Sequence, residues 1–164
     1  MFQEMRRKKQ QLSDAACMEL LEQCTSGVLA VLGEDGYPYA VPLSYVCDGR
    51  NIYFHSATQG HKLDAIRAHP QASFCVIAKD QIIPEKYTTV FSSVIAFGKI
   101  RILDQEQEKR EAIRKLALRY TPDGSFEKRE DEINKYWNSL CMLEFTIEHM
   151  TGKQAKELLT GGAS

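Results

Sequence analysis

The chain has 164 residues, of which 43% are hydrophobic and 26% are charged. This length and composition predict one globular domain over residues 1–164, large enough to bury a core without disulfides or a structural metal. Twenty-one Lys and Arg balance 22 Asp and Glu to a net charge of −1, which argues against binding of duplex nucleic acid or anionic membranes. We therefore expect a small-molecule or protein partner.

The cysteines and histidines do not follow a metal-binding or disulfide pattern. Five cysteines occur without a Cys-x-x-Cys pair, and His55 and His61 straddle a turn. No metal site is expected. The first residues are charged and include no apolar run typical of a signal peptide, which predicts a cytoplasmic protein. Residues 1–12 are predicted to form a basic N-terminal arm and residues 154–164 a C-terminal tail.

The first half of the chain predicts one helix followed by hairpins. Ser13 is placed to cap a helix that runs to Cys24. Strands are then expected over residues 28–32, 37–47 and 51–57, with turns at 34–36 and 48–49. One face of the second strand is small, and its Pro42 lacks an amide donor. Either a flat ligand or a packed neighbour is expected against that face.

The second half predicts more strands with helices between them. Helical spacing covers residues 60–69, 105–120 and 127–137, and strands are expected over 73–78, 88–103 and 142–148, with a loop over 80–87. Gly98 is expected to kink the long strand. Successive hairpins with inserted helices favour a mainly antiparallel β-barrel with peripheral helices over a doubly wound α/β sheet.

The densest polar cluster lies in residues 55–62, where a strand leads into a helix. Free amides at a helix N-terminus attract phosphate, and Ser56, Thr58 and Lys62 add hydroxyl donors and a positive charge. In the alternative interpretation, Ser56 and Thr58 cap the helix and Lys62 is solvated. The Walker and Rossmann glycine patterns are both absent from this segment.

Several segments taken together are similar to a known family. They are residues 27–32, Gly36-Tyr-Pro-Tyr-Ala-Val-Pro-Leu-Ser-Tyr45, Ile52-Tyr-Phe-His-Ser-Ala57, Gly60-His-Lys-Leu63, Ser73-Phe-Cys-Val76 and Ser93-Val-Ile-Ala-Phe-Gly98. From Met5 to Lys153 the chain resembles the FMN-binding pyridoxamine 5'-phosphate oxidase-like superfamily. Within that superfamily it is most similar to the 5-nitroimidazole-resistance proteins.

The resemblance implies a six-stranded antiparallel split β-barrel with peripheral α-helices. It also implies a homodimer with FMN, or FAD, bound at the interface. The implied cofactor contacts fall into three groups. Lys62, Ser56 and His61 match the phosphate-binding stretch, and His55, with Ala57 after it, falls on the strand that runs beside the flavin ring. Ala40, Val41 and Pro42 match the strand that borders the isoalloxazine. Ser92, Ser93 and Val94 match a stretch that reaches the cofactor from the same subunit or from the partner subunit.

The function implied by the resemblance is an FMN-dependent oxidoreductase that reduces nitroimidazoles or other small planar acceptors, with NAD(P)H as electron donor. His55 is either its proton donor or a structural histidine, and Trp137 either closes over the flavin or packs elsewhere. The Arg-x-Val-Leu-Leu-Lys-type strand of vitamin B6 oxidases is missing, so that activity is not expected. Alternatives are a non-catalytic flavin or haem carrier or sensor, with His149 as an iron ligand, and a cofactor-free dimer.

Overall fold

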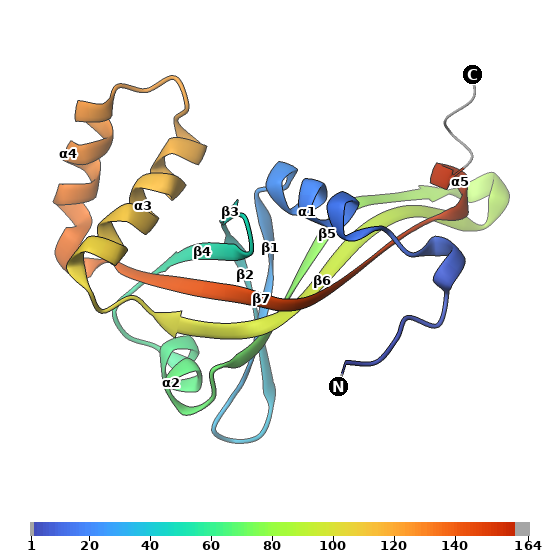
Figure 1. Ribbon diagram of the computed structural model, residues 1–164, viewed down its shortest axis with the longest axis horizontal. Helices are drawn as coiled ribbons and strands as arrows, with labels where there is room; N and C mark the ends of the chain where they lie inside the picture. The colour runs from blue at the N-terminus through green and yellow to red at the C-terminus, as the bar shows by residue number, and fades with distance from the viewer. Residues whose placement is uncertain (1, 160–164) are drawn as a thin grey trace.

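The computed structural model describes residues 2–159 and shows a single antiparallel sheet flanked by helices (Figure 1). The strand order is β2-β1-β5-β6-β7-β4-β3. The expected antiparallel β class with peripheral helices is confirmed. The strands are β1 (Ser26–Leu32), β2 (Pro38–Ser44), β3 (Val46–Asp48), β4 (Asn51–Ser56), β5 (Gln71–Ile83), β6 (Thr88–Ile102) and β7 (Cys141–Gln154).

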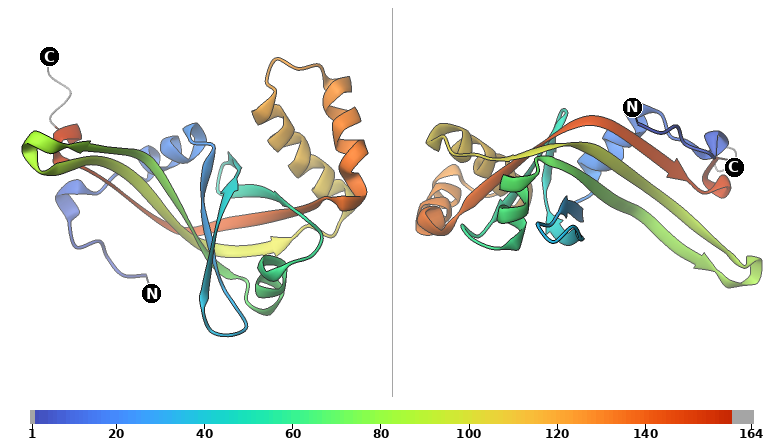
Figure 2. Two further views of the ribbon diagram at one scale, coloured as in Figure 1. Left: turned by 180° about the vertical axis from the view of Figure 1, so that it is seen from behind. Right: turned by 90° about the horizontal axis from the view of Figure 1, so that it is seen from below.

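The helices occupy distinct positions around the sheet. Helix α1 packs against β7, α2 connects β4 to β5 along the chain and packs against β1 and β6, and α3 and α4 form a hairpin at one end of the sheet (Figures 1 and 2). Their bounds are α1 (Asp14–Gln23), α2 (His61–Ala68), α3 (Glu106–Tyr120), α4 (Phe126–Tyr136) and α5 (Lys156–Leu159), with short 3-10 turns at Lys8–Gln10, Pro84–Lys86 and Trp137–Ser139.

Two clusters of buried side chains form the core. The larger one fills the inside of the sheet and centres on three aromatic rings, in which Phe74 meets Tyr45 and Phe54 edge-to-face at centroid distances of 4.9 and 5.1 Å. Such edge contacts are the favoured geometry for aromatic pairs. The smaller cluster joins Tyr53 of β4 and Met142 of β7 to α3. The α3–α4 hairpin is therefore anchored to the sheet mainly through α3.

The structure has seven strands where six were expected, because the predicted strand over 37–47 is divided at Tyr45. The Tyr45 side chain is 1% exposed, and its hydroxyl donates a 2.6 Å hydrogen bond to the Leu21 carbonyl of α1. Its amide also bonds to Thr25 rather than to a strand partner. Tyr45 thus leaves the ladder, and the residues after it form the separate edge strand β3.

The predicted loop over 80–87 is wrong for residues 80–83, which belong to β5, whereas residues 84–87 form the turn to β6. Strand β5 continues to Ile83 and pairs with β6 as far as the Ile83–Thr88 pair. The resulting β5–β6 arm projects away from the rest of the sheet (Figures 1 and 2). Its polar and proline residues suggested a loop, but cross-strand hydrogen bonds override that local preference. Ile82 and Tyr87 near the tip are 71% and 100% exposed.

Other local predictions are confirmed. The Ser13 side chain caps α1 by accepting a hydrogen bond from the Ala16 amide at 3.2 Å. The β6–β7 register shifts between Phe97 and Gly98, as the expected kink requires. A Cβ atom at position 98 would lie 2.0 Å from the Thr146 carbonyl oxygen, so the bulge leaves room only for glycine there.

The N-terminal arm lies along β7. The Leu12 amide donates to the Gly152 carbonyl at 2.8 Å, and a Cβ at position 152 would come 2.5 Å from the Cys17 sulfur. Burial raises the pKa of the Cys17 thiol to about 11. Of the predicted C-terminal tail, Gln154 ends β7, and residues 160–164 lie outside the described part, as does residue 1 of the arm. No helix within residues 2–159 has the length and apolar character to cross a bilayer.

The Tyr45 hydrogen bond provides a test of this architecture. The Leu21 carbonyl lies in the last turn of α1, where it has no acceptor role within the helix. Tyr45→Phe should therefore lower the free energy of unfolding by about 1–2 kcal/mol, measured by urea denaturation. Tyr37→Phe, at a 75% exposed position, serves as the control and should leave stability unchanged. Equal stability of the two variants would contradict this assignment.

Candidate functional site

Helix α2 begins without a side-chain cap. Its N-cap is Gly60, at φ 131° and ψ 165°, a backbone conformation that glycine adopts far more readily than other residues. Helices α1 and α4 differ, because Ser13 and Ser125 each accept a hydrogen bond from the first turn. The amides that open α2 are consequently available to an anion, and the helix dipole favours negative charge there.

The alternative in which Ser56 and Thr58 cap α2 is wrong. The structure gives the helix a different N-cap residue, and neither hydroxyl bonds to its first turn. Ser56 is the last residue of β4 and is only 9% exposed. We call Ser56, the Gly60 cap and the first turn of α2 the β4–α2 cradle.

Lys62 provides the positive charge of the cradle. Burial lowers the pKa of its ammonium, which the nearby Cys141 sulfur partly offsets. The imidazole of His55 has a lowered pKa, first because of burial and then because of the Lys62 charge. Both effects would be relieved by an anion bound between them. The acidic residue of the same turn, Asp64, is paired with Arg67 at 3.0 Å.

His61 joins the cradle to the β1–β2 hairpin. Its ring packs against Tyr39 of β2 at a centroid distance of 4.6 Å, and its Nε2 atom lies close to Gly33. Strand β2 is thereby held next to the start of α2. Ala40 and Pro42 alternate with Tyr39 and are exposed, whereas Val41 is half-buried and packs against the core. The small face of β2 is thus open in the described chain, with no neighbour of its own packed over it.

Pro42 begins a row of residues that crosses five strands. It pairs with Val28, Val28 with Cys75, Cys75 with Ile95, and Ile95 with Thr151. Val28 and Ile95 are 37% and 39% exposed, and Ile77 beyond them is 66% exposed. An apolar surface therefore runs from the small face of β2 across the outer side of the sheet, and we call it the outer sheet face.

Ser92, Ser93 and Val94 lie far from the cradle within one chain. Ser93 pairs with Lys153 of β7, whereas Ser56 pairs with Cys141 at the other end of the same strand. At about 3.3 Å per residue these points are roughly 40 Å apart along β7. Val94 is fully buried and Ser92 is 6% exposed, so Ser93 alone of the three points toward the outer sheet face.

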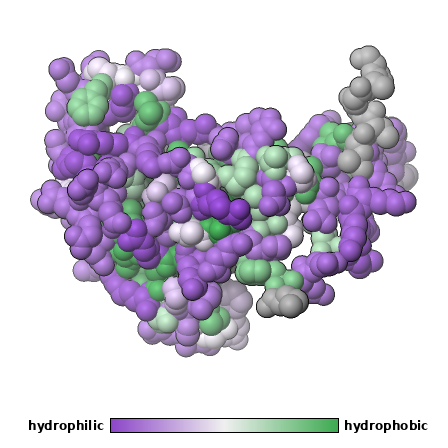
Figure 3. Space-filling view, in the orientation of Figure 1, coloured by the Kyte–Doolittle hydropathy of each residue, from purple (hydrophilic) through white to green (hydrophobic). Residues whose placement is uncertain are grey.

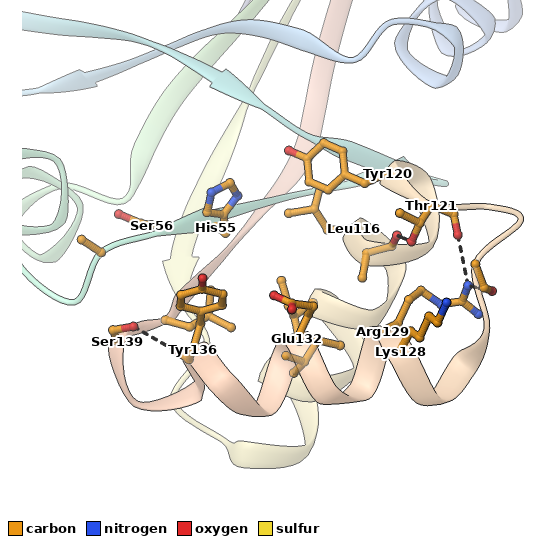
Figure 4. A pocket seen from close by; sticks show the side chains of 16 residues that line it. His55, Ser56, Leu116, Tyr120, Thr121, Lys128, Arg129, Glu132, Tyr136 and Ser139 are labelled. Carbon is orange, nitrogen blue, oxygen red and sulfur yellow. Dashed lines mark hydrogen bonds between the residues drawn. The ribbon is translucent and has the colours of Figure 1, made fainter.

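A cavity of about 620 Å³ opens beside the cradle, between the end of β4 and the α3–α4 hairpin. His55, Ser56 and Ala57 form one wall, and Figure 4 shows Tyr120 of α3 and Tyr136 and Glu132 of α4 pointing into the space. This cavity was not predicted from the sequence. Tyr120 and Tyr136, which are 53% and 54% exposed on amphipathic helices, are the residues that could have indicated a binding surface here.

Two further candidates lie apart from the cradle. The Trp137 ring is held between Lys109 and Arg110, whose cationic groups are 4.1 and 4.2 Å from its centroid, so it has a packing role. His149 stacks on Phe2 at 4.6 Å, and its buried Nε2 atom has no hydrogen-bond partner. Among residues 2–159 no three His, Cys, Asp or Glu side chains gather as metal ligands.

The fold is similar to several solved structures. A conserved hypothetical protein from Mycobacterium tuberculosis aligns with a TM-score of 0.81 and 17% identity over 98% of this chain and 96% of that chain. A candidate 5-nitroimidazole antibiotic resistance protein from Bacteroides thetaiotaomicron gives 0.74 and 18% over 87% and 85%. An FAD- and haem-binding protein from Mycobacterium smegmatis gives 0.70 and 19% over 94% and 81%.

At the level of sequence, no curated protein gave a significant match. A family model described as pyridoxamine 5'-phosphate oxidase matches residues 13–154. The match includes the β4–α2 cradle, the small face of β2 and the whole sheet. The chain therefore belongs to the pyridoxamine 5'-phosphate oxidase family.

Proposed function

We propose that the protein is a flavin-dependent oxidoreductase in which each chain forms one domain and two chains form the cofactor sites. The observation that carries this proposal is the uncapped N-terminus of α2, which contains Lys62 and follows Ser56, next to the exposed small face of β2. The N-terminus of α2 is suited to bind a phosphate, and the small face of β2 is suited to contact a flat ring. The FAD-binding relative with the same fold supports a flavin as ligand.

The cradle would hold the phosphate of FMN, or the corresponding phosphate of FAD. Lys62 contributes a charge, Ser56 a hydroxyl donor and the first turn of α2 its amides. Ala40 and Pro42 carry no long side chain, so the backbone of β2 can approach the ring face while Val41 anchors the strand in the core. The bound flavin would supply the hydride or electron transfer.

His55 is suited to hold a proton near the cradle. Its lowered pKa makes the imidazole neutral at pH 7, when it has one donor and one acceptor nitrogen. An approaching phosphate would favour the charged form and allow the side chain to donate from both nitrogens. The proposed acceptors are nitroimidazoles or other small planar molecules, and the proposed electron donor is NAD(P)H.

A homodimer follows from the outer sheet face. Its exposed apolar residues continue directly into the small face of β2, so a second copy packed there would close over the ring site. The same packing would bring Ser93 of the partner subunit close to the cofactor. Figure 3 shows that the face presented in Figure 1 is mostly hydrophilic, with smaller hydrophobic patches.

A second candidate function is a non-catalytic carrier or sensor. It is favoured by His149, whose Nε2 atom is buried without a partner and is an available ligand for haem iron. Phe2 covers this ring, so the N-terminal arm would have to move before iron could bind.

The visible spectrum of the purified protein separates these candidates. We expect flavin absorption that NAD(P)H bleaches and a nitroimidazole restores. A flavin that neither reagent affects would indicate a carrier, and a Soret band would indicate haem. A colourless protein that takes up neither FMN nor FAD would contradict flavin binding altogether.

The same preparation tests the cradle. Lys62→Ala should weaken FMN retention about tenfold or more, because a hydrogen bond from a charged group is lost. Lys79→Ala is the control, since it removes one positive charge at an exposed position of β5, away from α2. Equal retention by both variants would mean that Lys62 does not contact the phosphate.

The titration of His55 can be followed by NMR in the flavin-free protein. Its midpoint should lie below 6.5, and Lys62→Ala should raise it, because the Lys62 charge opposes protonation. Binding of FMN should raise it as well, since the phosphate favours the imidazolium. By linkage, FMN affinity should then increase as the pH falls from the midpoint of the FMN-bound protein to that of the flavin-free protein. Lys79→Ala, on β5, is the control; an unmoved midpoint in Lys62→Ala would refute the coupling.

The dimer can be tested by placing a charge on the outer sheet face. Ile95→Arg should convert a dimer into a monomer in light-scattering chromatography and should also release the flavin, although Ile95 is distant from the cradle. Leu118→Arg adds the same charge at a 50% exposed position on α3 and should leave both properties unchanged. A monomeric wild type, or a dimeric Ile95→Arg variant, would disprove this interface.

A further inference from the structure

The cavity beside the β4–α2 cradle begins where the proposed flavin phosphate would end. Its wall includes His55, Ser56 and Ala57, which border the cradle, and it includes no residue of β2. The ring of a flavin would therefore lie on one side of the cradle and this cavity on the other. A ligand that enters the cavity from the cradle must continue beyond the phosphate.

The two helices that line most of the cavity are joined to each other by ion pairs and hydrogen bonds. Arg114 and Arg110 of α3 form ion pairs with Glu130 of α4 at 2.7 and 3.4 Å. At the turn between the helices, the Arg129 guanidinium donates to the Thr121 carbonyl at 3.0 Å and to the Gly124 carbonyl. These contacts hold α3 and α4 at a defined distance from each other. The volume of the cavity, about 620 Å³, is typical of small-molecule sites.

The chemistry of the walls suits a nucleoside. Leu116, Ile133 and Leu140 line the interior, and the two exposed tyrosines, Tyr120 and Tyr136, offer aromatic faces for a base to stack on. Glu132 points into the same space from α4, and its carboxylate can accept hydrogen bonds from ribose hydroxyls or an exocyclic amine. Aromatic faces and one acceptor are what adenosine requires.

We propose that this cavity holds the adenosine half of FAD, so that the protein is an FAD rather than an FMN protein. The proposal rests on the proposed flavin site and extends it. The second phosphate of FAD would pass His55 and Ser56, and the adenine would lie between the α3–α4 hairpin and β4. A nicotinamide donor or a nitroaromatic acceptor fits this cavity less well, because each must reach the flavin ring on the β2 side.

Isothermal titration of the flavin-free dimer with FMN and with FAD tests the proposal. FAD should bind at least about tenfold more tightly than FMN. Tyr136→Ala should weaken FAD binding about tenfold and leave FMN binding unchanged, and Glu132→Gln should have the same selectivity with a smaller effect. Phe126→Ala is the matched control, because Phe126 is an exposed aromatic residue of α4 that does not line the cavity.

A second titration uses AMP as the probe, because AMP is the part of FAD that FMN lacks. AMP should bind to the FMN-loaded protein, where the cavity remains free, and should not bind to the FAD-loaded protein. Equal affinities for FMN and FAD, both insensitive to Tyr136→Ala, would overturn the cavity assignment and leave the flavin site standing. An equal loss of both flavins in Tyr136→Ala would overturn it too. Binding of neither flavin to the wild type would refute the flavin site itself, and NADH binding to the FAD-loaded protein that Tyr136→Ala weakens would assign the cavity to the donor.

Discussion

The amides that begin α2 have no side-chain acceptor, and the arrangement of the candidate site depends on this fact. In α1 and α4 a serine side chain accepts a hydrogen bond from the first turn. At α2 the cap is a glycine with a positive φ angle, so the strand can turn sharply into the helix without filling the space above it. Lys62, Ser56 and the β1–β2 hairpin are arranged around that opening. A positive end of a helix next to a charged lysine is unfavourable unless an anion is present.

Local signals in the sequence predicted much of the fold. Ser13 before an apolar stripe, the glycine turns and Gly98 in a long strand each act through their nearest neighbours, and each has the expected role. The β5–β6 arm was missed because its stability comes from hydrogen bonds between strands rather than from its own residues. Tyr45 was assigned to a continuous strand because alternation alone does not reveal that its hydroxyl reaches α1.

The candidate site was predictable only in part, for a related reason. Residues 55–62 are contiguous, so the cradle could be identified as a cluster, and the structure excludes the capping of α2 by Ser56 and Thr58. The cavity walls come from β4 and from the α3–α4 hairpin, and β4 ends at Ser56 whereas α3 begins only at Glu106. Ser92, Ser93 and Val94 were predicted to contact the cofactor only because of the family resemblance. Within one chain they lie at the opposite end of β7 from the cradle.

The packing of Cys17 under Gly152 has a consequence for the chemistry that this protein can tolerate. Burial raises the pKa of Cys17 and of Cys47 to about 11, and the pKa values of Cys24, Cys75 and Cys141 are raised as well. Since the thiolate is the form that peroxide attacks, all five sulfurs are slow targets at neutral pH. The sheet and its helices are thus protected from disulfide cross-linking of their own core when the surroundings become oxidising.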